Sequence, residues 1–486
     1  GGQMFMRSLG FLTQLIRDEH RSQYSKAIIA HLANNKELFS MILRQTINTQ
    51  YPTAIEFVCR MLMFGDRKKF REKITELKVS MLLGGNDTHP GVLIRYIRKG
   101  QGTEIHNILK IIEMLIRNDP NPTQHEIDIQ NWFINQNVFL FLKLIIERNS
   151  NVPKLVYTSL LIYATLAGSL HIKDNTASEI ALTMVSDQCL RLTELKLQNM
   201  IIFTLSSLSA KRIELQRILM DTQAFNYACH LIKSYGNQGN IVEAARLGLL
   251  EEALNVCLKQ LQLTISPEQS QQLWTEGGEK NGLTLLFFEE PFVKCLLNVL
   301  VSGSMSELLK TKAVQVMVEG LSLPNNRFAP ILFSTFDEIK RENVVSAVFH
   351  SVGTIMLSGT PTGSGAAFLR AVADLLVFIV NDPTVSPSLI AYAKSNSTHF
   401  PLNILFCPVF ENEERIAKKL LLVCKELITK DPEVQQLWGQ YREQFNNLSV
   451  CGNYEIAPLA TDILGFLGSE GQTDFDITMN FANAFS

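Results

Sequence analysis

The sequence predicts an all-α fold, a right-handed α-solenoid in which short helical repeats stack into a superhelix. Three observations lead to this expectation. Residues 132–148 and 218–234 start 86 residues apart and match in their apolar positions without a gap. Half of 86 is 43, the length of one helical repeat. Helical periodicity is also nearly continuous, and Asp-Pro pairs recur between the expected helices.

The two matching segments align apolar residues with apolar residues over nearly their whole length. Four residues of the first segment align with four of the second: Val138, Phe139, Ile145 and Ile146 with Ala224, Phe225, Leu231 and Ile232. Chance similarity does not keep such a register over 17 positions, so we interpret the match as a repeat.

Apolar residues recur at spacings of three and four along the chain, which is typical of amphipathic helices. No long stretch alternates with a period of two, so we expect almost no sheet. The helical ranges are 5–16, 27–43, 54–64, 105–116, 138–146, 155–170, 197–208, 213–220, 242–261, 284–301, 305–323, 344–357, 366–380, 415–429, 433–450 and 457–467. We therefore expect one array of about ten repeats over residues 1–469.

The expected helices end at short breaks with strong stop signals. Asp-Pro pairs follow apolar runs at Asp119, Asp382 and Asp431. Proline cannot continue the preceding helix but suits the first turn of the next one, which the aspartate can cap. Asn151-Val152-Pro153 is a similar break, and Gly84–Gly91 and Gly359–Gly365 read as loops.

Residues 470–486 differ from the rest of the chain. They are acidic and carry the spaced apolar residues Phe475, Ile477, Phe481 and Phe485. Two interpretations remain open. The segment is disordered, or it docks as a cap on the last repeat, whose outer face would otherwise be exposed.

Composition bounds the class of protein. The chain has 486 residues, of which 46% are apolar and 19% charged, so it can bury a large core. Its eight cysteines form no Cys-x-x-Cys pair and mostly lie within apolar runs. We interpret them as small buried hydrophobic residues in a reducing compartment, which predicts an intracellular protein of the cytoplasm or nucleus.

Charge is unevenly distributed along the chain. Residues 1–120 hold 18 Lys and Arg against 11 Asp and Glu, and the remainder holds 27 against 36. The densest basic stretch contains Arg67, Lys68, Lys69, Arg71, Lys73 and Lys78, and Arg95, Arg98 and Lys99 follow it. The simplest interpretation is a solvated helix face. The alternative is contact with nucleic acid or an acidic membrane surface.

No motif for catalysis, metal binding or cofactor binding is present. The nine histidines form no His-x-x-x-His pair, and the adjacent Cys229 and His230 would point in different directions on a helix. His230 aligns with Leu144, so we expect it to be partly buried. The Gly359–Gly365 stretch lacks the lysine of a phosphate-binding loop. We therefore expect a protein without catalytic residues, metal or cofactor, although a site without a recognisable motif stays open.

The longest uncharged run, Leu155 to Ile172, has 18 residues and is short for a membrane span. It contains several polar residues and lies between Lys154 and Lys173. We interpret it as a core helix and predict no transmembrane segment.

Residues 120–235 resemble armadillo repeats. Ser159–Ala167 (SLLIYATLA) and Ile201–Ser209 (IIFTLSSLS), 42 residues apart, are similar to the end of the family's third helix, and the segments FINQNVFLFLKLII and LMDTQAFNYACHLI are similar to its second helix. Outside this region both armadillo and HEAT repeats remain open. The resemblance implies an α-solenoid and says little about function.

The resemblance has one informative departure. The branch of the family with importin-α and β-catenin lines its groove with Trp and Asn from third helices. The matching positions here hold Leu161 and Phe203 in place of Trp, and Thr165 and Ser207 in place of Asn. Binding of nuclear-localisation peptides by that mechanism is therefore not expected.

The sequence favours a non-catalytic scaffold or adaptor that docks partner proteins on the superhelix. A partner would lie along the face made by third helices, near Leu161, Thr165, Phe203 and Ser207. The competing hypothesis is the contact of nucleic acid or acidic membrane with the basic residues from Arg67 to Lys78 and from Arg95 to Lys99.

Overall fold

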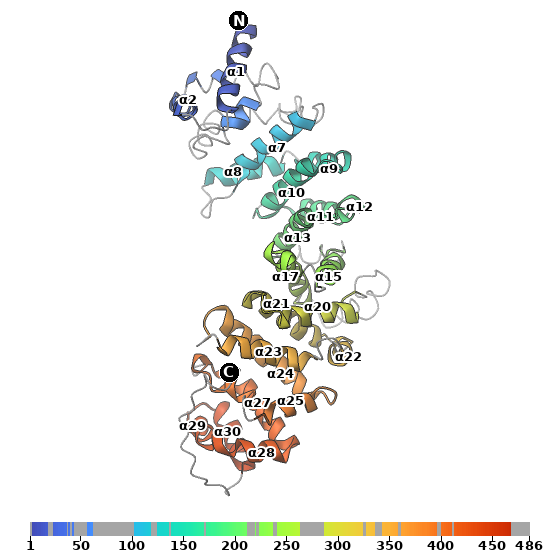
Figure 1. Ribbon diagram of the computed structural model, residues 1–486, viewed down its shortest axis with the longest axis vertical. Helices are drawn as coiled ribbons and strands as arrows, with labels where there is room; N and C mark the ends of the chain where they lie inside the picture. The colour runs from blue at the N-terminus through green and yellow to red at the C-terminus, as the bar shows by residue number, and fades with distance from the viewer. Residues whose placement is uncertain are drawn as a thin grey trace. The chain divides into compact units, whose positions relative to one another are not determined.

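The structure, a computed structural model, describes residues 2–17, 23–35, 37–38, 41–42, 56–61, 102–117, 124–135, 138–169, 172–210, 219, 223–236, 241–262, 286–323, 327–335, 343–357, 361–395, 400–410 and 413–467 (Figure 1). Within these ranges the chain is helical and forms no strand. It divides into two compact units, residues 1–222 and 223–486.

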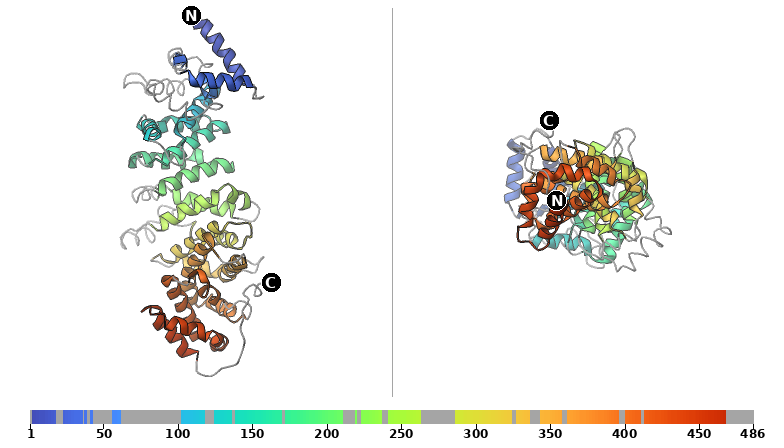
Figure 2. Two further views of the ribbon diagram at one scale, coloured as in Figure 1. Left: turned by 90° about the vertical axis from the view of Figure 1, so that its left-hand side faces the viewer. Right: turned by 90° about the horizontal axis from the view of Figure 1, so that it is seen from below.

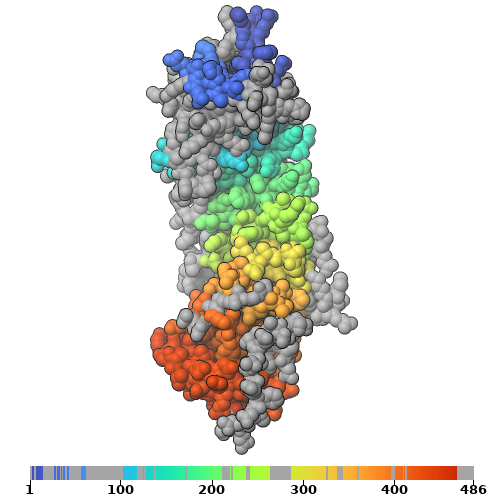
Figure 3. Space-filling model, turned by 60° about the vertical axis from the view of Figure 1, so that its left-hand side comes forward, coloured from blue at the N-terminus to red at the C-terminus, as the bar shows by residue number. Residues whose placement is uncertain are grey.

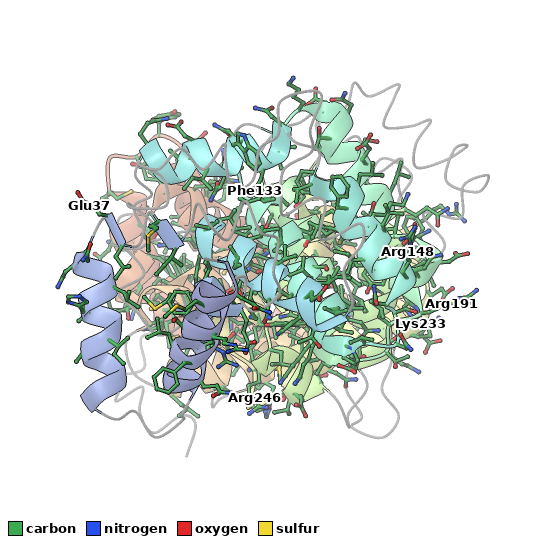
Figure 4. The ribbon with its side chains drawn as sticks, turned by 90° about the horizontal axis from the view of Figure 1, so that it is seen from above. Glu37, Phe133, Arg148, Arg191, Lys233 and Arg246 are labelled. Atoms are coloured by element: carbon green, nitrogen blue, oxygen red, sulfur yellow. The ribbon has the colours of Figure 1, made fainter. Side chains whose placement is uncertain are left out.

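The first unit contains the following helices: α1 (Gly2–Arg17), α2 (Gln23–Asn34), α7 (Gly102–Ile116), α8 (Gln124–Asn135), α9 (Val138–Arg148), α10 (Pro153–Ala167), α11 (Asp174–Met184), α12 (Asp187–Leu190) and α13 (Leu195–Ser209). Exposed Arg148 and Arg191 lie at the outer edge of these helices, whereas Phe133 is only 3% exposed (Figure 4).

The second unit contains α15 (Ala224–Tyr235), α16 (Ile241–Arg246), α17 (Leu249–Leu261), α20 (Glu290–Val301), α21 (Glu307–Leu321), α22 (Phe328–Ser334), α23 (Val344–Leu357), α24 (Ser364–Asn381), α25 (Ser386–Ala393), α26 (Leu402–Leu405), η3 (Pro408–Phe410), α27 (Glu414–Lys430), α28 (Pro432–Trp438), η4 (Gly439–Tyr441), α29 (Arg442–Ser449) and α30 (Ile456–Phe466).

One long helix of each repeat packs directly on its counterpart in the next repeat. In the first unit α10 packs between α7 and α13. In the second unit α17, α21, α24, α27 and α30 pack in that order, each on the next. We call these the third helices, and the left view of Figure 2 shows the stacked helices of the first unit in teal and green. This stacking is the α-solenoid that the sequence predicts.

The helices α10 and α13 confirm the repeat at the level of single residues. Both helices have 15 residues. A shift of 42 positions superimposes eight buried residues of α10 on eight buried residues of α13: Leu155, Ser159, Leu160, Ile162, Tyr163, Ala164, Leu166 and Ala167 on Leu197, Ile201, Ile202, Thr204, Leu205, Ser206, Leu208 and Ser209. The repeat therefore preserves burial even where it changes residue type.

The 86-residue match is explained in the same way. All eight aligned residues from α9 and α15 are buried, and Phe139 and Phe225 are no more than 2% exposed. The prediction that these segments are equivalent core helices is confirmed.

Besides the range 27–43, which is interrupted at Asn35, two expected helices are broken in the structure. The range 242–261 divides into α16 and α17 at Gly248, whose φ of 80° lies in the left-handed region that glycine tolerates. The range 433–450 divides into α28, η4 and α29. Both ranges keep apolar periodicity across the break, so periodicity did not reveal it.

The Asp-Pro signals have two different outcomes. Asp431 caps α28 as predicted, because its side chain accepts hydrogen bonds from the N–H groups of Glu433 at 2.8 Å and Val434 at 3.2 Å. Asp382 accepts instead from the N–H of Thr384 at 2.8 Å, and α25 starts only at Ser386. It therefore caps a turn. Asp119-Pro120 and the Gly84–Gly91 loop lie outside the described residues.

The cysteines are buried with one exception. Seven are buried and Cys451 is exposed, so the expectation of a buried thiol is wrong at that position. Cys451 follows α29 in a turn before α30, where no further helix covers it.

The core interpretation of residues 155–172 is confirmed, since most residues of α10 are buried. Among the described residues one helix, α24, is long and apolar enough to cross a membrane, and 61% of it is buried inside the protein. It carries Arg370 and Asp374 and packs between α21 and α27, as a core helix does.

Candidate protein-binding surface

The four third-helix residues singled out from the sequence occupy equivalent places on α10 and α13. Leu161 and Thr165 lie one turn apart on α10, and the Thr165 hydroxyl donates to the Leu161 carbonyl at 2.9 Å. Phe203 and Ser207 lie one turn apart on α13, and Phe203 is 40% exposed. Leu161, Thr165 and Ser207 are of intermediate burial, and Phe203 is exposed. The structure therefore brings them to one accessible face of two stacked helices.

The second unit has a groove on its third helices. Its volume is about 740 Å³, and its walls come from α21, α24, α27 and the residue before α30. The lining residues are Val318, Glu319, Ser322, Asp374, Val377, Phe378, Glu414, Arg415, Lys418, Lys419, Leu422 and Glu455. In the space-filling view of Figure 3, the described residues of this unit adjoin one another and are coloured from yellow to red along the chain.

The groove has an apolar part. Val318, Val377 and Phe378 are of intermediate burial, and Leu422 is 39% exposed. Exposed apolar side chains gathered in a concave surface and surrounded by polar groups are typical of the centre of a protein interface.

Ion pairs between neighbouring third helices surround this apolar part. Lys419 of α27 pairs with Asp374 of α24. Lys418 pairs with Glu455 at 2.9 Å. Because these side chains are a quarter to nearly half exposed, each pair contributes about 0–1 kcal/mol to stability. They hold lysine ammonium groups at fixed positions along the groove.

The same kind of pair continues on either side of the groove. Lys425 of α27 pairs with Asp462 of α30 at 2.7 Å, and Lys312 of α21 pairs with Glu251 of α17 at 2.7 Å. The third helices of the second unit therefore present a charged face, whereas α10 and α13 present Leu161, Thr165, Phe203 and Ser207.

Arg370 of α24 and Glu413, the residue before α27, form a bidentate ion pair. Arg370 Nε donates to Glu413 Oε2 at 2.8 Å, and a terminal guanidinium nitrogen donates to Oε1 at 2.5 Å. These hydrogen bonds lower the pKa of Glu413 and raise the pKa of Arg370. Such bidentate geometry fixes the start of α27 relative to α24.

The basic stretch predicted as an alternative contact lies outside the described residues. This applies to Arg67, Lys68, Lys69, Arg71, Lys73, Lys78, Arg95, Arg98 and Lys99. The hypothesis of a nucleic-acid or membrane contact there stays a prediction.

The groove was not identified from the sequence, although the spacing of its α27 residues is visible there. Arg415, Lys418, Lys419, Leu422 and Lys425 recur at spacings of three and four, which places them on one face of a helix. Their partners Asp374, Glu455 and Asp462 come from other helices, and only the fold brings them together.

The adjacent Cys229 and His230 point in different directions, as expected. Cys229 is buried and its sulfur lies 3.8 Å from that of Cys257. His230 is exposed and lies 3.4 Å from the Ser234 hydroxyl, so the expectation of partial burial is wrong. The His230 ring on α15 occupies the position equivalent to Leu144 on α9. Leu144 is of intermediate burial. Among the described residues no group of three His, Cys, Asp or Glu could hold a metal ion.

Comparison with known proteins identifies the fold. No protein-family model matches the chain, and no curated protein matches it. Solved structures do match. SYS-1 in complex with POP-1 has a TM-score of 0.64 at 13% identity, covering 96% of this chain and 88% of SYS-1. A structure from work on a phosphorylation switch that controls the interaction between cadherin and β-catenin has a TM-score of 0.52 at 14% identity, covering 96% of both chains.

An engineered protein also matches, with a TM-score of 0.57 at 11% identity over 97% of both chains. The fold is therefore an armadillo-type α-solenoid. At these identities the likeness concerns the fold.

Proposed function

We propose that this protein is a non-catalytic scaffold or adaptor that binds partner proteins along the face of its third helices. The observation that carries the proposal is the groove of about 740 Å³ on α21, α24 and α27. A groove that spans three successive repeats offers an elongated surface, which suits a polypeptide better than a compact metabolite.

The composition of the groove supports a protein partner. Leu422 and Phe378 supply apolar area, and Lys418 and Lys419 lie beside them with their acidic partners. This arrangement of apolar centre and charged rim matches protein interfaces. The helices are ordered by packing within the unit, so docking a partner does not require the receptor to fold, which lowers the entropic cost of association.

Two structures of the same fold come from a complex of SYS-1 with POP-1 and from work on the interaction between cadherin and β-catenin. The likeness supports protein binding as the class of function. The identity of a partner for this chain is a separate question, to be answered by experiment.

The proposal includes a reducing compartment, the cytoplasm or nucleus. Support comes from the eight cysteines, all of which are free thiols in the structure, including the buried pair Cys229 and Cys257. A protein that matured in an oxidising compartment would be expected to use disulfides.

The decisive test is affinity purification of full-length protein with mass spectrometry, comparing the wild type with groove variants. Leu422→Arg places a charge in the apolar part of the groove. Leu357→Arg is the matched control, because Leu357 of α23 is 53% exposed and lies outside the groove. Circular dichroism should be unchanged for both variants.

We expect the groove variant to lose specific partners and the control to keep them. With a purified partner, the loss of one buried leucine corresponds to about 1.5–3 kcal/mol, roughly 10- to 100-fold in Kd. Retention of every partner by Leu422→Arg would exclude the groove as the binding surface.

A parallel variant tests the face of the first unit. Thr165→Arg combined with Ser207→Arg adds bulky charges to α10 and α13 beside Leu161 and Phe203. If this face binds a partner, pull-down is abolished while circular dichroism stays the same. Binding that survives the double substitution would show that α10 and α13 are not part of the interface.

The competing function, contact with nucleic acid or an acidic membrane, predicts a different behaviour. Neutralising Arg67, Lys68 and Lys69 should then abolish binding, and the affinity of the wild type should fall steeply with salt. Binding that is insensitive to salt and to these substitutions favours the scaffold.

A further inference from the structure

The groove of the second unit has two chemical requirements for an occupant. Val318, Phe378 and Leu422 are accessible apolar side chains that an occupant should cover. The α27 side of the groove is basic, because this helix contributes Arg415, Lys418 and Lys419 against Glu414 to the lining. The lining carboxylates Asp374 and Glu455 are already paired with Lys419 and Lys418. An acidic segment with regularly spaced apolar side chains satisfies both requirements.

Such a segment is present in this chain, directly after the described residues end at Leu467. Residues 470–486 contain three acidic residues and no Lys or Arg, a net charge of −3. Apolar side chains alternate with polar ones from Phe475 through Ile477 and Met479 to Phe481. In an extended chain alternate side chains point to one side, so these four would form one apolar edge.

The charges on α27 are accessible to such a segment. Arg415 is exposed, and no carboxylate pairs with it in the described part of the chain. Lys418 and Lys425 are each bonded to one carboxylate while remaining 40% and 33% exposed. An ammonium group has three donors, so each lysine can bond a second carboxylate without losing the first.

The connection is long enough. Lys418 pairs with Glu455 and Lys425 pairs with Asp462, so α30 runs parallel to α27 with a constant offset of 37 residues. The 11 residues of α30 rise about 16 Å along the axis. The eight residues from Leu467 to Phe475 reach about 27 Å when extended. Phe475 can therefore return along α30 to the level of Lys418 and Leu422.

We propose that residues 470–486 occupy the groove on α21, α24 and α27 and compete with partner proteins for it. Phe475, Ile477 and Phe481 cover the apolar side chains of the groove, and Asp474 and Asp476 bond to the basic side of α27. The inference rests on the proposed function, because the occupied surface is the proposed partner site. Tethering gives the segment an effective concentration in the millimolar range, so modest intrinsic affinity is enough for occupancy.

The first experiment locates the segment in the full-length protein. The photo-crosslinking residue p-benzoylphenylalanine replaces Phe475, and after irradiation mass spectrometry identifies the attached peptide. We expect attachment within one molecule to peptides of α24 or α27 that contain Phe378 or Leu422, and loss of this product in the Leu422→Arg background. The same residue at position 466, where Phe466 of α30 is 40% exposed, is the positional control.

Other products of this experiment would overturn the proposal. Attachment near Val450 or Tyr454 would show that the segment caps the terminal repeat. Attachment between two molecules would identify a second copy as the occupant. Absence of any product that depends on Phe475 would show that the segment is not bound.

A second experiment measures competition with a defined probe, a fluorescein-labelled peptide of residues 470–486. It is added to the full-length wild type and to the full-length double variant Phe475→Ser with Phe481→Ser, and binding is followed by fluorescence anisotropy. If the native segment fills the groove in about nine molecules of ten, the variant binds the peptide about 10-fold more tightly. Equal affinity for both proteins, or no binding to the variant, contradicts the proposal.

The two proposals can fail separately. If Leu422→Arg loses partner proteins while crosslinks from position 475 lie elsewhere, the scaffold function stands and the occupancy by residues 470–486 is wrong. If the crosslinks lie in the groove and no partner depends on Leu422, the occupancy stands and the partner site is wrong.

Discussion

At the scale of single residues, burial separates the cysteine that can react from those that cannot. Burial raises the pKa of Cys59 and of Cys295 to about 12, and it also raises the pKa of the Cys424 thiol. Thiolates are the reactive form of cysteine, so such thiols are inert at neutral pH. Cys451 is the exposed exception.

We therefore predict that a maleimide labels one cysteine of the folded protein at neutral pH, and that this cysteine is Cys451. Intact-mass spectrometry should show a single addition, which disappears in Cys451→Ser. In denaturant all eight thiols should react. Rapid labelling of a second thiol under native conditions would show that one of the seven buried positions opens to solvent.

Gly320 on α21 is a residue whose missing side chain permits close packing. A Cβ atom there would lie 2.8 Å from Phe328 Cδ1 and 3.0 Å from Phe287 Cζ. These two rings are buried and stacked with centroids 4.7 Å apart, so they cannot move aside freely. Overpacking of this kind typically costs 1–3 kcal/mol, about as much as several surface ion pairs.

We predict that Gly320→Ala lowers the free energy of unfolding by about 1–3 kcal/mol. The matched control is Gly465→Ala on α30, where no atom lies within 4 Å of the added Cβ. Alanine is the better helix former, so the control should be neutral or stabilising by up to about 1 kcal/mol. Urea denaturation followed by circular dichroism measures both. Equal effects of the two variants would mean that packing around Gly320 adjusts without strain.

At the scale of helices, the sequence predicts positions better than boundaries. The eight-residue burial match of α10 and α13 follows from apolar spacing, which the sequence shows directly. The break at Gly248 and the division of 433–450 into three elements depend on backbone geometry that apolar spacing does not record. The expected helical ranges left out helices that include α8, α11, α12, α22, α25 and α26. Four of these, α12, α22, α25 and α26, have eight residues or fewer, which carry too little periodic pattern.

The candidate site likewise has one part that the sequence predicts and one part that depends on how the helices pack. Leu161, Thr165, Phe203 and Ser207 were found from the sequence because a repeat aligns equivalent positions within one short stretch. The groove was missed because its ion pairs join residues 37 and 45 positions apart, and pairing at that distance is determined by helix packing. The basic stretch from Arg67 stays untested.

The Arg370–Glu413 pair between α24 and α27 predicts a pH dependence. Its hydrogen bonds lower the pKa of Glu413 from the ordinary value of 4.5. A lowered folded-state pKa means that the pair stabilises the protein above pH 4.5, and that this stabilisation disappears as the pH falls through the folded-state pKa. The pair is partly exposed, so it contributes about 1 kcal/mol or less.

We expect Glu413→Gln to have a lower melting temperature than the wild type at pH 7 and the same melting temperature well below pH 4.5. Glu426→Gln, within α27, is the control, because Glu426 makes no ion pair with a described residue. Thermal unfolding at a series of pH values measures the difference. A gap between wild type and Glu413→Gln that persists at acidic pH would show that charge pairing is not its cause.

At the scale of the whole molecule, stability is distributed along stacks of repeats. Within the second unit α24 packs on α21 and α27, and α15 packs on α17 and α20 instead. Repeat arrays behave approximately as a sum of repeat stabilities and nearest-neighbour interfaces. A defect in one third helix should therefore spread first to the two adjacent third helices.

We predict that Leu376→Ala, which removes a fully buried side chain of α24, weakens hydrogen-exchange protection most in α24, α21 and α27. The expected cost is about 2–5 kcal/mol, because a cavity is left in a packed core. Protection of α15 should change less, since two helices, α17 and α21, lie between it and α24 in the packing order. Leu376→Met is the control, because it nearly conserves volume and should cost less than about 1.5 kcal/mol. Hydrogen-exchange mass spectrometry resolves these helices individually. An equal loss of protection in α15, α21 and α27 would show that the second unit unfolds as one cooperative block, and substitutions in the groove could then not be interpreted as local.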